Sequence, residues 1–573
     1  MSETIILGID CGGTHTDAAL LAVNGAACQL LAKAKTTTRH ANLPASIAEA
    51  VHLLSQSLGK LPENIARATI GTTLEINALV QGKADKVGLA LTAGPGLDPV
   101  HFALGDYVCI VPGGLDHRGV EVEKPYLEIL AKEAPKWAAA GITTCACVGK
   151  FSPRNPAHED AMARTITKAC GLPVTVGHLL SGKLNFPRRI ATAYYNAAVT
   201  RLHANFLAAV ENGLAALGIK TQLRLLKADG GAIPFQVSAR EPVQSILSGP
   251  AASVMGALAI WAGAAKGCSL LLDMGGTTTD IAMFLNGSPV VDRAGMTILG
   301  RHTLVRSLAS ISIAVGGDSC LGIDNASSGK PEITVGPERL GPAMAFGGQR
   351  ATLLDALNFL DGVQSRTERG DLAASVQGIE ELAKTADQTP EDVASAAVSA
   401  ALAKIARAAY ELVERVNSRP VYTLAALKAA RQARPTKICL VGGPAECIRD
   451  RLAQALGLPI EIPPDASVAN AIGAALTIPT ASLEVYADTG KGMLTAPALN
   501  YSERIPASFT LEQTKAAACD LLRQNLTADG ITDSKVEVVE ADLFATLDDY
   551  GRGSKDMRVA CQVQPGIVSR MLA

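Results

Sequence analysis

The chain has 573 residues, enough for roughly three to four domains of ordinary size. Its 52 Lys and Arg residues nearly balance its 54 Asp and Glu residues, and the formal net charge is -2. This balance gives no electrostatic reason to expect nucleic acid or an anionic membrane as a partner, so small-molecule chemistry is the first function class to consider.

The first residues predict a protein that is not secreted. Met1 to Asp10 have no basic segment and enter an apolar run at once, unlike a secretory signal. Twelve cysteines are scattered along the chain without a CxxC pair. They are expected to be reduced thiols of a cytoplasmic protein, and this pattern disfavours a zinc or iron–sulfur site.

One motif occurs twice and organises the sequence. Residues 5–21 (IILGIDCGGTHTDAALL) recur as residues 269–285 (SLLLDMGGTTTDIAMFL), and both contain D-x-G-G-T-x-T-D. In each copy an apolar run ends at an aspartate, a glycine pair follows, and a second apolar run begins after another aspartate. This pattern predicts a β-hairpin with a glycine-rich turn. A single glycine pair would indicate only a turn, but two equivalent copies favour a functional role.

The turn residues are suited to binding phosphate. Glycines lack Cβ and let backbone N–H groups converge on an anion, while threonine hydroxyls add donors. Neither copy is a Walker loop or a dinucleotide GxGxxG motif. The predicted phosphate-binding residues are Gly12, Gly13, Thr14, Thr16, Gly275, Gly276, Thr277 and Thr278.

The aspartates at the strand ends are the predicted catalytic groups. Asp10 and Asp273 can hold Mg²⁺ or position a nucleophile, because hard carboxylate oxygens suit this ion. Asp17 and Asp280 either cap the hairpins or contact metal or substrate. His15 could touch phosphate or simply face solvent.

Further along the chain, the sequence predicts an amphipathic helix from about Ala45 and a long helix through Ala191 to Leu217. Asp229 precedes a glycine pair and could orient a substrate or water, although Asp-Gly is also common turn chemistry. The Gly- and Ala-rich segment 249–265 has a proline, Pro250, in the first turn of a helix that starts at Ser248. It therefore predicts a buried helix rather than a membrane span.

A third element lies near the end of the second half. The apolar strand Ile438–Val441 runs into a glycine pair, and a helix of small residues is expected at Ala469–Leu476. Glycines permit close approach of a ribosyl or flat group, so this segment predicts an adenosine pocket. The expected contacts are Gly442, Gly443, Pro444 and Gly473.

The order of phosphate hairpin, second hairpin and adenosine segment resembles the superfamily of actin, heat-shock chaperones and sugar kinases. More narrowly, the chain resembles the A-type hydantoinase/oxoprolinase family, which includes ATP-dependent subunits of acetone and acetophenone carboxylases. At Glu75 the chain differs from this family, where an alanine is expected. The matching segments are 71–73, 77–78, 155–159, Arg189, Thr192, Asn196, 229–231, 248–251, the second hairpin and QVQPGI at 562–567.

The resemblance implies an α/β protein with duplicated actin-like, ribonuclease H-like ATPase lobes. It implies ATP and Mg²⁺ as cofactors, a cyclic amide substrate activated by phosphorylation of its carbonyl, and a B-type partner subunit in an oligomer. An ATP-driven reactivating or chaperone-like factor, an ATP-dependent carboxylase subunit and a small-molecule kinase remain alternatives. His117, Arg118 and His158 lie in polar stretches that suit a solvated surface at least as well as catalysis.

The expected organisation has three parts. Residues 1–184 would form the first lobe with an αβ insertion, and residues 185–480 would form the second lobe with the second hairpin and the adenosine segment. Residues 481–573 would form a small C-terminal αβ module.

Overall fold

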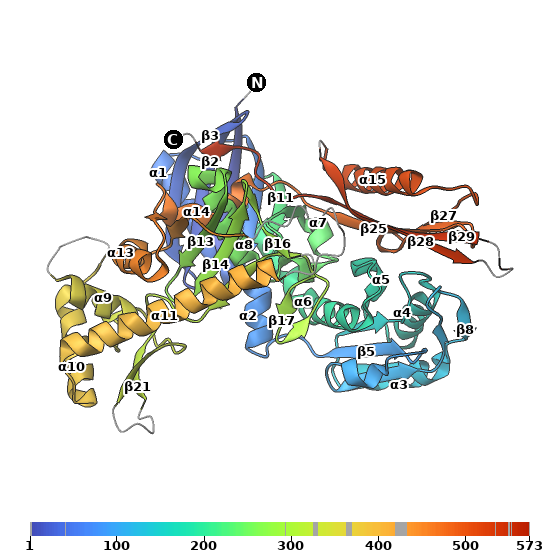
Figure 1. Ribbon diagram of the computed structural model, residues 1–573, viewed down its shortest axis with the longest axis horizontal. Helices are drawn as coiled ribbons and strands as arrows, with labels where there is room; N and C mark the ends of the chain where they lie inside the picture. Colours follow the sequence, from blue (N-terminus) through green and yellow to red (C-terminus); the bar gives the residue numbers. More distant parts are fainter. Residues whose placement is uncertain are drawn as a thin grey trace.

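The computed structural model describes residues 3–39, 42–292, 294–324, 331–362, 369–418, 433–532, 534–547, 551 and 553–571. Two twisted sheets form the centre of the molecule (Figure 1). The first sheet has seven strands in the order β12 (Ala232–Pro234), β11 (Gln222–Leu226), β4 (Ile65–Thr72), β1 (Thr4–Cys11), β2 (His15–Asn24), β3 (Ala27–Thr37) and β30 (Arg570–Met571).

The second sheet repeats the arrangement of the first. Its strands are β15 (Ser288–Pro289), β14 (Thr279–Leu285), β13 (Cys268–Met274), β23 (Ile438–Val441) and β24 (Ile460–Glu461), with β20 (Ser310–Ile313) also paired to β14. In both sheets the hairpin's first strand pairs antiparallel with the second and parallel with a later strand. The predicted duplication of an α/β lobe is therefore confirmed.

Both predicted hairpins are confirmed with the same register. Asp10 lies opposite Asp17 in the first hairpin, and Asp273 lies opposite Asp280 in the second. Each turn is closed by one backbone hydrogen bond, from Gly12 N–H to the His15 carbonyl (3.0 Å) and from Gly275 N–H to the Thr278 carbonyl (2.9 Å). The repeated sequence thus folds into the same local structure twice.

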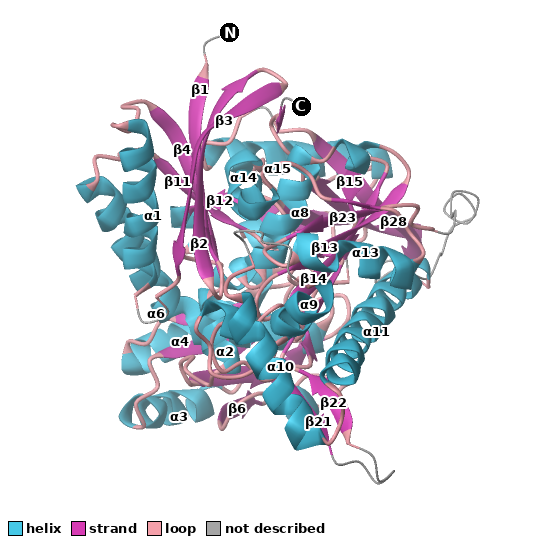
Figure 2. Ribbon diagram, turned by 90° about the vertical axis from the view of Figure 1, so that its left-hand side faces the viewer, coloured by secondary structure: helices cyan, strands magenta, loops and turns pink. Residues whose placement is uncertain are grey.

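Two short apolar helices lie between the sheets (Figure 2). α8 (Ser248–Ile260) precedes β13, and α14 (Ala469–Leu476) has the predicted bounds. Their backbones approach closely: a Cβ on Gly256 would lie 2.1 Å from the Ala469 carbonyl oxygen, and one on Gly473 would lie 2.2 Å from that of Ala252. The predicted buried helix after residue 248 is confirmed, and its small residues serve this crossing.

The outer face of the first sheet is covered by α1 (Leu43–Leu58) and α6 (Phe186–Ala216). The predicted amphipathic helix is α1, which buries Ile47, Val51 and Leu54. α6 begins earlier than expected, because Asn185 caps its first turn. The short helix α7 (Phe235–Ser238) follows β12.

The outer face of the second sheet packs against helices that follow the hairpin in the chain. α11 is the one described helix with the length and hydropathy of a membrane span, but its apolar side chains belong to this core, as in a buried globular helix. The helices are α9 (Leu353–Asp361), α10 (Leu372–Ala386), α11 (Pro390–Asn417) and α13 (Ala445–Leu456). Two-stranded ribbons pair β16 (Val291–Asp292) with β19 (Ser307–Leu308), β17 (Thr297–Ile298) with β18 (Arg301–His302), and β21 (Leu321–Asp324) with β22 (Glu332–Val335).

An αβ insertion follows β4, as the sequence suggested. Its parallel sheet has the order β10 (Val174–Val176), β9 (Thr144–Val148), β5 (Val87–Thr92) and β6 (Tyr107–Val111). Its helices are α2 (Leu74–Val80), α3 (Leu127–Ala139), α4 (Ala157–Cys170) and α5 (Gly177–Leu180), and β7 (Gly114–Leu115) pairs with β8 (Glu121–Glu123).

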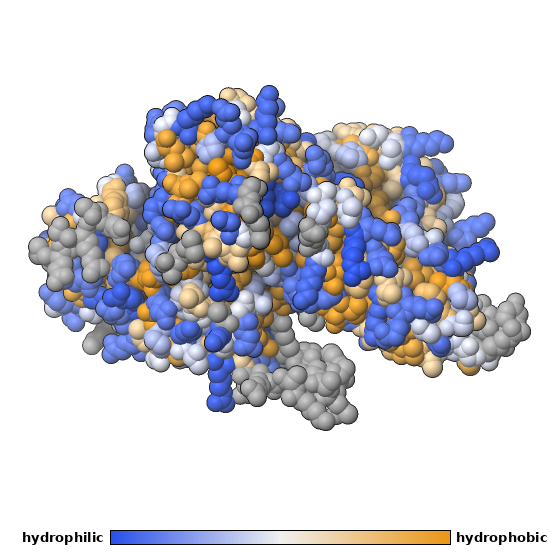
Figure 3. Space-filling model, turned by 90° about the horizontal axis from the view of Figure 1, so that it is seen from above, coloured by the Kyte–Doolittle hydropathy of each residue, from blue (hydrophilic) through white to orange (hydrophobic). Residues whose placement is uncertain are grey.

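The C-terminal region forms a five-stranded antiparallel sheet with one helix, on the right in Figure 1. The elements are β25 (Ser482–Asp488), β26 (Met493–Ala496), β27 (Tyr501–Arg504), α15 (Leu511–Ala528), β28 (Val536–Leu547) and β29 (Gly553–Val563). Seen from above, hydrophilic groups alternate with apolar patches over the surface (Figure 3). The first sheet takes β11, β12 and β30 from beyond residue 184, so it crosses the expected boundary there.

The helix crossing gives a stability prediction. Gly473→Ala would place Cβ against the α8 backbone and is expected to destabilise the protein by about 1–3 kcal/mol, as overpacking does. Gly213→Ala in α6 meets nothing within 4 Å and should stabilise it by about 0.5–1 kcal/mol. Urea unfolding of both variants measures this contrast, and equal stability of the two would contradict the close crossing.

Candidate functional site

The carboxylates at the two hairpin ends converge on one side chain of α14. Asn470 donates from Nδ2 to Asp10 Oδ2 (3.2 Å). Burial raises the pKa of Asp273, and hydrogen bonds from Ser253 and from the same Asn470 side chain partly offset this rise. Asp273 is also near enough for its charge to raise the pKa of Asp10. The two motifs, more than 250 residues apart in sequence, therefore meet at one site.

Each aspartate lies beside a glycine of the neighbouring parallel strand. A Cβ on Gly71 would lie 2.4 Å from Asp10 Oδ1, and one on Gly442 would lie 3.0 Å from Asp273 Oδ1. Asp273 also accepts a short hydrogen bond from the Ser253 hydroxyl of α8. These glycines leave the space that the carboxylates occupy, so the site has the same local design in both lobes.

Burial and mutual repulsion raise the pKa values of these carboxyls. Desolvation, followed by the nearby charge of Asp17, raises the pKa of Asp10 to about 7. Desolvation and the charge of Asp273 raise the pKa of Asp280 to about 7. Oδ1 of Asp10 and Oδ1 of Asp280 are buried without a hydrogen-bond partner. Lys35 pairs with Asp17 (2.9 Å), and this one cation only partly offsets the negative charge of the four carboxyls.

The hairpin turns are accessible next to these carboxylates. Gly12, Thr14 and residues 275–278 are partly exposed, and Gly13 is exposed with open space in its Cβ direction. A second glycine pair packs on the second turn, where the N–H groups of Gly317 and Asp318 donate to the carbonyls of Gly275 and Gly276. The turn residues predicted to bind phosphate can therefore reach a ligand, with one exception.

Thr16 is the exception among the hairpin residues. It is fully buried, and its hydroxyl lies 3.0 Å from that of Thr38 and donates to Cys11 Sγ. Thr279 holds the equivalent place in the second hairpin, where its hydroxyl donates to the Val315 carbonyl (2.6 Å). This threonine secures each hairpin to the following segment, and the expected phosphate contact of Thr16 stays a prediction that its burial does not support.

The predicted adenosine segment is only partly open. Gly442 is partly exposed with φ of 101°, a backbone conformation that favours glycine, and Gly443 is exposed. Pro444 is buried, and a Cβ on Gly317 would lie 2.7 Å from its Cγ. Gly473 faces α8 instead of an opening. Protein atoms cover both Pro444 and Gly473, so their expected nucleotide contacts stay predictions that this packing does not support.

Asp229 lies in a different environment from the other predicted catalytic residues. It is fully buried and forms ion pairs with Arg306 (2.5 Å) and Lys227 (3.4 Å), while the Thr480 hydroxyl donates to it (2.9 Å). The charges of Lys227 and Arg306 hold the pKa of this carboxyl well below its usual range, despite desolvation. These partners give the carboxylate a structural role, and its expected catalytic role stays a prediction.

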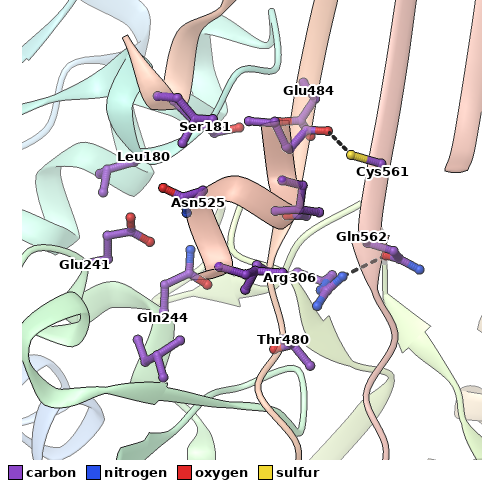
Figure 4. A pocket seen from close by; sticks show the side chains of 18 of the residues that line it. Leu180, Ser181, Glu241, Gln244, Arg306, Thr480, Glu484, Asn525, Cys561 and Gln562 are labelled. Atoms are coloured by element: carbon purple, nitrogen blue, oxygen red, sulfur yellow. Dashed lines mark hydrogen bonds between the residues drawn. The ribbon is translucent and has the colours of Figure 1, made fainter. Parts of the chain in front are cut away.

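Beside this ion cluster lies a cavity of about 160 Å³ between the first lobe, the insertion and the C-terminal module. Figure 4 shows Arg306 directed toward Gln562, with Glu241, Gln244 and Asn525 around the opening. Burial raises the pKa of Glu241. The cavity is amphipathic, since leucine side chains such as Leu522 and Leu526 complete its wall.

The remaining candidates divide by burial. His15 is exposed on the first turn, and partial burial and Lys35 lower its pKa. His117 is exposed, whereas His158 is buried and bonds to Glu121 (2.9 Å). Sequence reasoning missed Asn470 and Ser253, whose signal is a polar side chain within an otherwise Ala- and Gly-rich apolar helix.

The arrangement suits a ligand with several negative charges and a divalent cation. Open backbone N–H groups at two glycine turns can hold phosphate oxygens, and unpaired carboxylate oxygens beside them can hold a hard cation. No group of three or more His, Cys, Asp or Glu side chains with metal-ligand spacing occurs in the described part of the chain. A cation there would therefore keep water or ligand oxygens in its coordination shell.

Comparisons with known proteins identify the fold and the family. The duplicated lobes with facing hairpins have the α/β, actin-like fold that the sequence predicted. The chain belongs to the hydantoinase/oxoprolinase family: the family model matches residues 189–482, and the model of the family's N-terminal region matches residues 6–170.

Relatives with sequence similarity are distant. Caprolactamase subunit alpha of Pseudomonas jessenii is 26% identical over 306 residues, covering 49% of this chain and 43% of the relative. An uncharacterised protein of Methanocaldococcus jannaschii is 25% identical over 281 residues, covering 44% and 40%. The aligned segments thus span less than half the length of either relative.

Two solved structures share the fold over nearly the whole chain. Nucleotide-free acetone carboxylase has a TM-score of 0.70 at 17% identity, covering 99% of this chain and 88% of that one. The ATP-dependent caprolactamase of Pseudomonas jessenii has a TM-score of 0.70 at 20% identity, covering 99% and 89%.

The raised pKa of Asp10 gives a prediction about pH. The folded protein binds this proton more tightly than the unfolded chain, so the contribution to stability is complete below 3.8 and is lost as pH rises through about 7. In magnesium-free buffer, Asp10→Asn should flatten this decline, and Mg²⁺ should reduce it in the natural protein. Urea unfolding at pH 5 and pH 8 measures both effects, with the exposed Asp450→Asn as control. If the free energy of unfolding of Asp10→Asn depended on pH as that of the natural protein does, the raised pKa of Asp10 would be contradicted.

The ion cluster gives a prediction about stability. Asp229→Ala would leave Arg306 and Lys227 without their buried counter-charge and should cost about 3–5 kcal/mol. Thermal unfolding at neutral pH measures the loss. Loss of activity with unchanged stability would instead return Asp229 to the catalytic residues.

Proposed function

We propose that this chain is the ATP-using component of a hydantoinase or oxoprolinase type enzyme that activates a cyclic amide for ring opening. The observation that carries the proposal is the convergence of Asp10 and Asp273 on Asn470, which brings two glycine turns to one site. The family assignment and the ATP-dependent caprolactamase among its relatives support the same reading.

The chemistry requires activation because amide resonance makes a lactam or hydantoin carbonyl a poor electrophile. Transfer of the γ-phosphoryl group of ATP to the carbonyl oxygen would release ADP and turn that oxygen into a leaving group. The protein's main contribution to such a transfer is to position the phosphates and stabilise their charge. We assign this work to the open turn residues Gly12, Gly13, Thr14 and 275–278, with Gly442 and Gly443 against the adenosine.

We assign Mg²⁺ to Asp10 and Asp273. The unpaired Oδ1 of Asp10 and the raised pKa values fit a cation, because its charge would relieve the repulsion between the carboxylates. When bound, Mg²⁺ supplies charge neutralisation of the phosphates. Asn470 and Ser253 would keep the two carboxylates in place by hydrogen bonds.

The proposal also includes a partner subunit and a cellular location for the enzyme. The similarity to a caprolactamase alpha subunit suggests a second, B-type subunit in an oligomer that completes ring opening. We expect a cytoplasmic enzyme. The shared fold with acetone carboxylase keeps a carboxylase subunit as the alternative, and a chaperone-like reactivating factor would use the same lobes to couple ATP to domain closure.

Substrate-stimulated ATP hydrolysis tests the proposal. Purified chain, alone and with a B-type subunit, should hydrolyse ATP faster with a member of a panel of lactams and hydantoins. Gly276→Val would push a side chain against Asp318 and block the second turn, and Asp10→Asn would remove one carboxylate. Each should lower the rate by roughly a hundredfold or more.

The exposed Asp450→Asn should keep the natural rate, which shows that the assay reports on the site. Stimulation by a protein client instead of any cyclic amide would favour the chaperone-like alternative, and dependence on bicarbonate would favour the carboxylase. If the purified chain bound no magnesium-bound nucleoside triphosphate, the proposal would be wrong.

A further inference from the structure

A second concave site lies where the first sheet meets the C-terminal module. The cavity has a volume of about 530 Å³. Arg67 of β4 and Arg224 of β11 line it together with Lys535, Gln564 and the segment Ile478–Pro479. It opens near the amino-terminal half of β4, whereas the hairpin site lies at the carboxyl end of the same strand, where Gly71 meets Asp10. The two sites are therefore separate.

The two arginines are adjacent on the inner face of the sheet. β4 and β11 are parallel neighbours, with Arg67 opposite Gln222 and Arg224 opposite Thr69. Their neighbours Ala68 and Leu225 face the outer core with α1, so alternation directs both arginines to the α14 side. Two guanidinium groups thus share one cavity on a face that is otherwise largely apolar.

Neither guanidinium has an acidic partner among the described residues. Arg67 donates to the Ala475 carbonyl (3.3 Å) and Arg224 to Gln222 Oε1 (2.8 Å), both neutral acceptors. The Nε atoms of both are buried without a hydrogen-bond partner. Desolvation and the charge of Arg224 lower the pKa of Arg67 to about 10. Among the residues that the structure describes, no carboxylate therefore pairs with either of these two like charges.

Glu537 is the one carboxylate in the described lining, and it does not pair with either arginine. Glu537 accepts from the side-chain amides of Gln562 and Gln564 instead. A purely structural role would be the contact of Arg67 with the carboxyl end of α14, which favours a cation. That contact does not explain Arg224, because a single arginine would suffice for it.

We propose that Arg67 and Arg224 form a binding site for a small oxyanion, phosphate or carboxylate, at the junction of the first lobe and the C-terminal module. Planar guanidinium groups present paired donors that match these oxygens, and two of them can hold one anion from two sides. Free phosphate and the carboxylate of an organic acid share this chemistry. The site is independent of the proposed ATP reaction, and its ligand would join two parts of the molecule.

Thermal unfolding of the full chain in anion-poor buffer tests the site, with sodium phosphate and sodium acetate titrated in parallel. A ligand that binds the folded state raises the melting temperature in a saturable way. We expect phosphate, acetate or both to do so, and the more effective one identifies the source. Arg224→Gln and Arg67→Gln should each weaken the response at least tenfold in concentration.

Three variants make the result specific. Arg523→Gln, on the exposed surface of α15, should respond like the natural chain. Gly276→Val, which blocks the second hairpin turn, should also keep the response, and this separates the site from phosphate bound at the hairpins. Without added anion, Arg224→Gln should be at least as stable as the natural chain, because repulsion is removed; a structural arginine would instead cause a loss.

A response that is lost in Gly276→Val and kept in Arg224→Gln would assign the phosphate to the hairpins and overturn the proposal. Absence of any saturable response in the natural chain, or an Arg224→Gln variant that is less stable without anion and equally responsive, would overturn it as well.

Discussion

The close crossing of α8 and α14 is the contact on which the rest of the structure depends. Gly256 and Gly473 let the two helix backbones meet, and any Cβ at either position would overlap the partner's carbonyl group. α14 packs on the first sheet and α8 contacts both sheets, and each helix carries one polar side chain, Ser253 or Asn470, to a hairpin carboxylate. The distance between the lobes, and hence between their aspartates, is therefore set by glycine at the crossing.

This closeness has an electrostatic cost that also explains the site. Burial is the main cause that raises the pKa values of Asp10 and Asp280 to about 7, and the charge of the facing carboxyl in the same hairpin, Asp17 or Asp273, adds to it. Folding alone would favour neutral side chains here. A cation that binds together with a polyanionic ligand would relieve this repulsion, so the carboxyls favour the binding of both.

The sequence predicted local structure well and long-range contacts poorly. The hairpins and the segment from Ile438 to Leu476 follow from glycine positions and apolar runs, which act over a few residues. The roles of Thr16, Pro444 and Gly473 depend on what packs against them, and those partners lie far away in the chain. The ion pairs of Asp229 could not be predicted for the same reason, since its partners Arg306 and Thr480 are contributed by distant segments.

Two buried polar side chains of α6 pair with residues of the insertion. α6 carries Arg189, which pairs with Glu159 (2.8 Å), and His203, which bonds to Glu75 (2.6 Å) and Ser238 (3.2 Å). The Ser–His–Glu order resembles an acyl-transfer triad, but all three side chains are fully buried, so the serine cannot meet a substrate. Glu75, the departure from the family pattern, is thus paired within the core.

Through Glu75, the pairing with His203 links α6 to α2 and the first hairpin. Glu75 lies in the first turn of α2, two residues after Thr73, whose N–H and hydroxyl both donate to the Cys11 carbonyl of the first hairpin. Separating buried partners of this kind costs several kcal/mol, about 3–5 for a charged pair. The insertion, α6, α2 and the first hairpin are therefore expected to move as one body, so that a substrate bound beside the insertion would be held in fixed relation to the phosphate turn.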